Sequence, residues 1–88
     1  MSDQALKDHQ ASTEQFIALA NEMTQGGIPA DLVSHALMTA SSLFATYTVA
    51  GNEGGLNESG VDKVVGRYRE TLEHIQQVKQ AEFGKKDS

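Results

Sequence analysis

The fold of this chain is decided by the stretch Leu32–Ala50, which reads LVSHALMTASSLFATYTVA. At about 100° per residue, nine of its residues project into one sector of roughly 140°. These nine are Leu32, Val33, Ala36, Leu37, Ala40, Leu43, Phe44, Tyr47 and Ala50. A strand would scatter them over both faces of a sheet, so the spacing predicts a helix. Most of the other positions are small, which is typical of a central helix packed on more than one side.

A second, smaller apolar line lies outside the main sector of this helix. It consists of Met38, Ala45 and Val49. In a three-helix bundle the middle helix could bury this line against its third partner. In a dimer the same line would be the contact surface, so both uses stay open.

The segment before the central stretch also has apolar residues at helical spacing. Apolar residues recur from Phe16 onward, and Leu6 falls on the same side, which predicts a helix over about residues 3–25. Ser12 with Gln15 three residues later has the form of a capping box, which would start the helix later. The shared side of Leu6 and Phe16 favours the early start.

The segment after this helix carries clear stop and start signals. Gly26 and Gly27 supply the left-handed conformations that close a helix, and Pro29 suits the first position of the next one. We therefore expect the central helix to span about residues 29–50.

The stretch Gly51–Gly60 contains four glycines and is predicted to be a loop, with Leu56 as its one apolar residue. Asn57 or Ser59 could cap a third helix over about residues 58–83. This helix has the cleanest amphipathic pattern in the chain. Its apolar face consists of Val61, Val64, Val65, Tyr68, Leu72, Ile75 and Phe83.

Three helices with short connections predict an all-α, three-helix, up-down-up antiparallel bundle. Residues 1–88 would form one domain, with 84–88 as a loose C-terminal tail. Leu, Ile, Val and Phe make up only 19 of the 88 residues, so the core is thin for a chain without disulfides. Self-association or a partner is therefore expected.

Composition argues against several classes of function. The net charge is −5 and neither half of the chain is basic, which disfavours nucleic-acid binding. The sequence contains no run of 18 apolar residues, so it predicts no membrane-spanning helix. There is no cysteine, which excludes disulfides and leaves the redox compartment unmarked. The N-terminal residues lack the pattern of a secretory signal, so we expect a cytoplasmic protein.

No residue pattern predicts a reaction. His9, His35 and His74 lie in three different helices, and no Glu-x-x-His or His-Glu-x-x-His motif is present. The loop Gly51–Gly60 lacks the Gly-Lys-Ser/Thr of a phosphate-binding loop, and Ser34 beside His35 points about 100° away from it. We expect no enzymatic activity, no cofactor, and no catalytic, cofactor-binding or metal-binding residues.

Two stretches resemble a bacterial domain-of-unknown-function family of small helical proteins. They are FIALANE at residues 16–22 and VSHALMTASSLF at residues 33–44, and they lie within about a third of the chain. The resemblance rests on Ala-Asn-Glu at the end of the first helix and Ala-Leu-Met-x-Ala-Ser in the second. The Gly51–Gly60 loop departs from the family pattern. The resemblance implies a small, cytosolic, helical bacterial protein and brings no activity, ligand or site.

These patterns favour a non-enzymatic protein-interaction module that self-associates or docks a protein partner through apolar helix surface. The candidate interface residues are Met38, Ala45 and Val49. The alternative is a protein that binds a small molecule or metal between helices, with His9 and Glu22 at the rim of the site.

Overall fold

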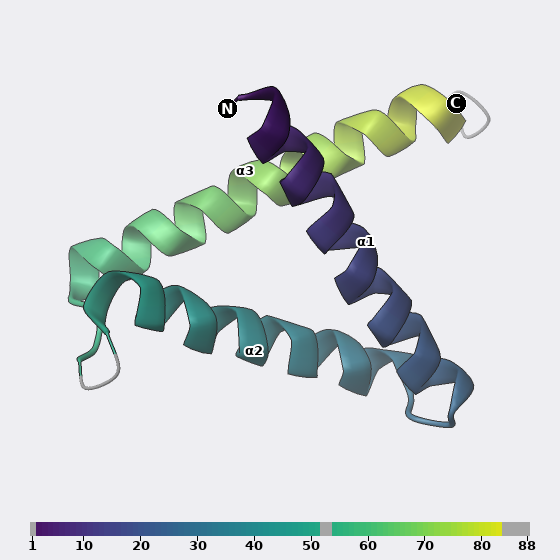
Figure 1. The fold of residues 1–88 in the computed structure, drawn as a ribbon, viewed down its shortest axis with the longest axis horizontal. Helices are drawn as coiled ribbons and strands as arrows, with labels where there is room; N and C mark the ends of the chain where they lie inside the picture. Colours follow the sequence, from purple (N-terminus) through teal and green to yellow (C-terminus); the bar gives the residue numbers. More distant parts are fainter. Residues whose placement is uncertain (1, 52–53, 84–88) are drawn as a thin grey trace. The chain divides into compact units, whose positions relative to one another are not determined.

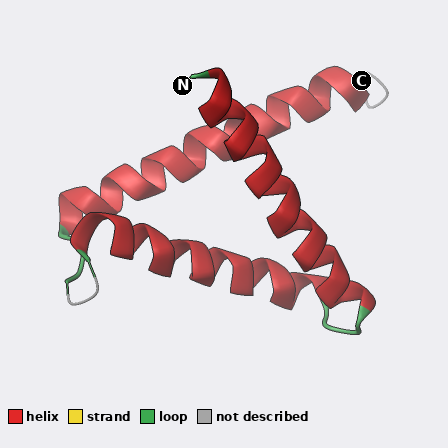
Figure 2. Cartoon of the chain, in the orientation of Figure 1, coloured by secondary structure: helices red, strands yellow, loops and turns green. Residues whose placement is uncertain are grey.

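The computed structural model describes residues 2–51 and 54–83, which form three helices joined by two short connections (Figure 1). Helix α1 spans Asp3–Gln25, α2 spans Ala30–Ala50 and α3 spans Glu58–Phe83. No strand occurs in this part of the chain (Figure 2). The predicted all-α class is confirmed. The predicted tail, residues 84–88, lies outside the described residues.

Helix α1 begins at the earlier of the two predicted starts. The hydroxyl of Ser2 accepts a hydrogen bond from the backbone N–H of Ala5 at 3.1 Å, which satisfies one of the free donors of the first turn. Asp3 adds a carboxylate at the positive end of the helix dipole. The alternative capping residue, Ser12, lies well inside the helix.

Glycine closes α1, but only Gly27 adopts the predicted left-handed conformation; Gly26 has a φ of −77° and keeps the right-handed helical region, so the prediction for Gly26 is wrong. Gly27 has a φ of +109°, its N–H donates to the carbonyl of Thr24, and the N–H of Ile28 donates to the carbonyl of Met23. This pair of bonds is the Schellman motif, in which a glycine follows the last helical turn. It satisfies carbonyls that the helix end would otherwise leave free.

Helix α2 starts one residue later than predicted. The carbonyl of Pro29 accepts hydrogen bonds from the N–H groups of Leu32 and Val33, both at 3.1 Å. Pro29 therefore precedes α2 instead of forming its first residue, and its fixed φ still leads the chain into the helix. Asp31 lies in the first turn.

Glycine also ends α2. Gly51 has a φ of +77°, and its N–H donates to the carbonyl of Tyr47 at 3.0 Å. Gly54 then lies against the end of the helix, since a Cβ atom there would stand 2.7 Å from the carbonyl oxygen of Ala50. Both positions require glycine, one for its conformation and one for the close approach.

Of the two predicted caps for α3, the structure selects Asn57. Its side-chain oxygen accepts from the N–H of Gly60 at 2.8 Å and from the hydroxyl of Ser59 at 3.1 Å. Its backbone carbonyl accepts from Val61. Leu56 lies beside the first turn of α3, within van der Waals reach of a Cβ on Gly60.

Contacts within the chain fall into two units, Met1–Phe44 and Ala45–Ser88, with the boundary inside α2. In the first unit, α1 and α2 meet at the glycine turn and separate away from it (Figure 1). Over residues 2–51 and 54–83, Val33 alone is buried, with 6% of its surface exposed. The up-down-up packing of a closed bundle therefore stays a prediction.

Substitution of two glycines by alanine should change stability in opposite directions. Gly27→Ala is expected to destabilise the chain by about 1–2 kcal/mol, because a Cβ is strained at positive φ. Gly66→Ala is expected to stabilise it by about 0.5–1 kcal/mol, since this glycine lies inside α3 and nothing stands within 4 Å of an added Cβ. Urea unfolding followed by circular dichroism measures the change in the free energy of unfolding for both variants. If Gly27→Ala changed it in the same direction and by the same amount as Gly66→Ala, the turn assigned to Gly27 would be contradicted.

Asn57→Ala should fray the first turn of α3 and lower the free energy of unfolding by about 1 kcal/mol, because the N–H of Gly60 loses its acceptor. Asn57→Asp retains an acceptor and serves as the matched control. Hydrogen exchange at Gly60 should rise in the alanine variant only. A similar loss in the free energy of unfolding for Ser59→Ala, with none for Asn57→Ala, would assign the cap to Ser59 instead.

Candidate protein-interaction surface

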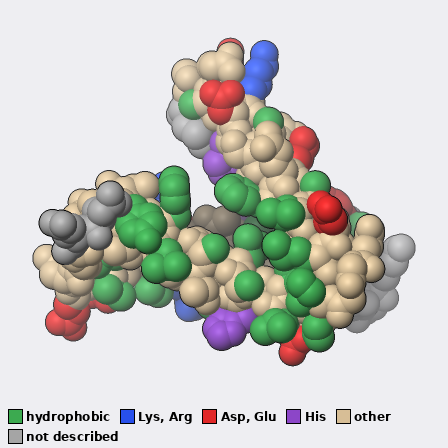
Figure 3. Space-filling view, turned by 60° about the horizontal axis from the view of Figure 1, so that its bottom comes forward, with side chains coloured by type: hydrophobic (Ala, Val, Ile, Leu, Met, Phe, Trp, Pro, Cys, Tyr) green, Lys and Arg blue, Asp and Glu red, His purple; other side chains and the backbone are tan. Residues whose placement is uncertain are grey.

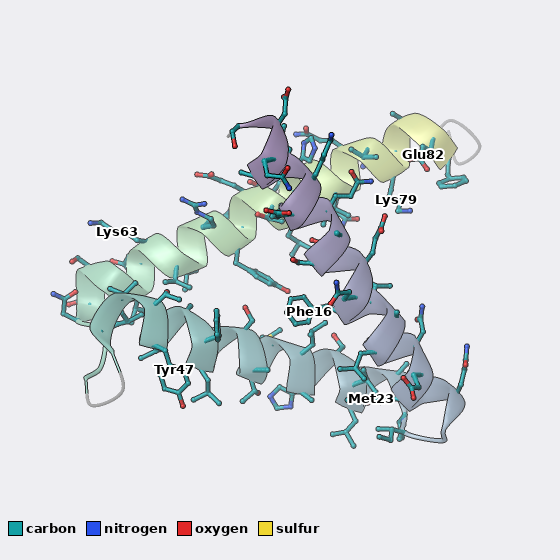
Figure 4. The ribbon with its side chains drawn as sticks, viewed as in Figure 1. Phe16, Met23, Tyr47, Lys63, Lys79 and Glu82 are labelled. Carbon is teal, nitrogen blue, oxygen red and sulfur yellow. The ribbon has the colours of Figure 1, made fainter. Side chains whose placement is uncertain are left out.

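Large apolar side chains lie at the surface of all three helices. In the described part of the chain, twenty large apolar side chains, all but Ile28 on the helices, keep between 38% and 69% of their surface exposed. Phe16 on α1 and Tyr47 on α2 are two that Figure 4 shows. Figure 3 shows apolar side chains, in green, at the surface of the helices. No described helix is long and apolar enough to cross a membrane.

Helix α2 is the least charged of the three helices, since Asp31 in its first turn is its one Asp, Glu, Lys or Arg residue. From Leu32 to Ala50 it contains no Asp, Glu, Lys or Arg. Helices α1 and α3 differ, since each carries acidic and basic side chains opposite its apolar face. A helix without a charged side is usually covered on all sides. The surface of α2 is therefore the strongest candidate for a contact.

The three candidate interface residues lie on one side of α2. Met38 and Val49 are 48% and 69% exposed, and Ala45, between them, is half-buried. Ser42 lies on the same side, one turn after Met38, and the sequence pattern of apolar residues alone did not single it out. The spacing from Met38 through Ser42 and Ala45 to Val49 is four, three and four residues. We call these four residues the second face of α2.

The hydroxyl groups around the second face donate hydrogen bonds to the backbone of their own helix. Thr39 donates to the carbonyl of His35 at 3.0 Å, and Ser42 donates to that of Met38 at 2.9 Å. Thr48 donates to the carbonyl of Ala45 at 2.8 Å. A contact could therefore remove water from this surface without stranding these hydroxyl donors.

Charged residues of α3 lie at its surface. Arg69 and Glu73, four residues apart, form an ion pair at 3.6 Å, with both side chains largely exposed. The ammonium of Lys79 lies 5.7 Å from the centre of the Phe83 ring. Figure 4 shows Lys63 extending from the same helix. Exposed pairs of this kind add only tenths of a kcal/mol and indicate a solvated side.

The residues considered for a ligand site are not brought together. His9 and Glu22 both lie in α1, thirteen residues apart, which is about 20 Å along a helix axis. They cannot line the rim of one small site. Among the described residues, no three His, Cys, Asp or Glu side chains are placed to hold a metal ion.

Comparison with known proteins adds no further assignment. No family model, no curated protein and no solved structure matches this chain. The resemblance to a bacterial family of small helical proteins therefore stays a prediction, and the surface of α2 has to be interpreted from its own chemistry.

Proposed function

We propose that this chain is a non-enzymatic protein-interaction module whose helices are completed by association with a protein surface. The observation that supports it is the stretch from Leu32 to Ala50 of α2, which carries no Asp, Glu, Lys or Arg on any side of the helix. Apolar patches beyond a few hundred Å² are uncommon on proteins that act alone, and they mark interaction sites.

The proposal includes the up-down-up bundle predicted from the sequence. The connections at Gly26–Pro29 and Gly51–Asn57 are short enough for neighbouring helices to pack antiparallel. In such a bundle α1 and α3 would cover the main apolar sector of α2. The second face would remain outward and available for a partner.

The chemistry of the proposed partner follows from that of the second face. Its residues are apolar or small and carry no charge, so a complementary surface would also be apolar. Nucleic acid fits poorly because the chain has a net charge of −5. We propose that this contact forms in the cytoplasm.

Native mass spectrometry of the full chain from the cells that produce it tests this proposal. We expect masses above the 9.5 kDa of a single chain. Met38→Glu should reduce the assembled fraction at least tenfold, because a carboxylate would be buried without a partner. Gln77→Glu, which adds the same charge on the polar side of α3, should leave it unchanged.

Two results would contradict the proposal. One is a bare mass of 9.5 kDa at every concentration tested, with nothing bound. The other is an equal loss of assembly in the Met38→Glu and Gln77→Glu variants, since that would indicate a general effect of charge.

A further inference from the structure

We propose that residues 43–49 of α2 encode a second, extended state, in which they pair as β-strands with the same residues of other copies of this chain. The segment reads LFATYTV, and only Ala50 of α2 follows it. In the helix these residues bond within one chain, and opening of this helix end releases them. This inference goes beyond the proposed function and does not rest on it.

The composition of residues 43–49 favours a strand over a helix. Five of the seven residues are β-branched or aromatic. They are Phe44, Thr46, Tyr47, Thr48 and Val49. Such side chains lose rotational freedom against the preceding turn of a helix and are enriched in strands. The helical state of this segment therefore depends on the rest of α2 and on packing, and not on local preference.

The spacing within the segment also fits a strand. Over the whole of Leu32–Ala50 the apolar residues follow the helical period, but the last seven before Ala50 also alternate. In an extended chain, four of them would share one face and three the other. They are Leu43, Ala45, Tyr47 and Val49 on the first face, and Phe44, Thr46 and Thr48 on the second. Aromatic, β-branched and threonine side chains on both faces stabilise paired strands.

The segment carries no charge that would oppose the pairing of identical copies. Segments of six or seven residues stack in this way when they are rich in strand-forming residues, contain no proline and have little net charge. The nearest charged residues are Asp31, twelve residues before the segment, and Glu53, four residues after it. Charged residues placed beside strand-forming segments commonly prevent such pairing.

No other part of the sequence combines these properties. Outside α2, residues 15–21 are the one other stretch of seven without a charged residue, glycine or proline. Only Phe16 and Ile17 among them are β-branched or aromatic. The pairing is therefore assigned to residues 43–49.

The structure places the segment at a helix end, where opening begins. Helix α2 ends at Ala50, and Gly51 follows with a φ of +77°. Helix ends fray because their last carbonyl groups lack partners within the helix. The hydroxyl of Thr48 donates to the carbonyl of Ala45 at 2.8 Å, and bonds of this kind compete with the helical ladder. Fraying of these turns makes the backbone of the segment available to other copies.

Incubation of the full chain near its melting temperature tests the inference. At tens of micromolar, the chain should form fibrils that bind thioflavin T and diffract at about 4.7–4.8 Å, the spacing of paired strands. Added sodium chloride should shorten the lag before fibrils form, because it screens the repulsion between chains of net charge −5.

Thr48→Lys and Thr71→Lys are a matched pair of variants. Both threonines are exposed, and each hydroxyl donates to a carbonyl of its own helix. Both changes add one positive charge, remove one such bond and introduce a better helix former. Thr48→Lys should lengthen the lag by about tenfold or more, because unpaired ammonium groups would be buried in the stacked segment. Thr71→Lys should leave the lag almost unchanged.

Hydrogen exchange of the wild-type fibrils locates the paired residues. Amides of residues 43–49 should be the most protected, because each bonds to the copy above or below it. Residues 15–21 serve as the internal control and should exchange faster. A protected core formed by other residues, with 43–49 exchanging freely, would overturn the assignment.

The remaining outcomes also decide the inference. Loss of helix without fibrils, or aggregates without the strand spacing, would overturn it. An equal lag for Thr48→Lys and Thr71→Lys would indicate a general effect of charge and overturn the role of this segment. A chain that binds a protein partner but forms no fibrils overturns this inference alone. A chain that binds nothing and forms fibrils through residues 43–49 overturns the proposed function alone.

Discussion

The constraint on which this protein depends is that α2, after Asp31 in its first turn, carries no Asp, Glu, Lys or Arg. From Leu32 to Ala50 it offers apolar groups on one side, and small or hydroxyl-bearing groups around the rest. Several of the hydroxyls are already bonded to the helix backbone. Such a helix is stabilised most when neighbours cover it on every side, because removing apolar groups from water lowers the free energy. The chain contains two other helices, and both are attached to the ends of α2.

The two connections join α2 to α1 at one end and to α3 at the other. Gly27 and Gly51 adopt positive φ angles that end a helix abruptly, and the chain then resumes helical structure within a few residues. Asn57 fixes the start of α3 by accepting hydrogen bonds on its side chain and its carbonyl. These features place α1 and α3 directly before and after α2 in the sequence.

The surface of the described residues, and not a cluster of reactive groups, supports the function that we propose. Arg69 and Glu73 pair in solvent on α3, and His9 and Glu22 are separated along α1. The uncharged second face of α2 supports the protein interaction that we propose.

The sequence by itself determined the three helices, the glycine turns and the early start of α1. Each of these depends on contacts within four or five residues, such as Ser2 with Ala5 and Ile28 with Met23, so their signals are written in short stretches. The sequence also placed Met38, Ala45 and Val49 on one side of α2, since helical spacing alone fixes that. Only the tertiary structure decided between Asn57 and Ser59 as the cap, and only it showed that Val33 is buried while Met38 and Val49 stay exposed. The reason is physical: both caps offer an oxygen at a suitable spacing, and burial depends on contacts between residues distant in the chain.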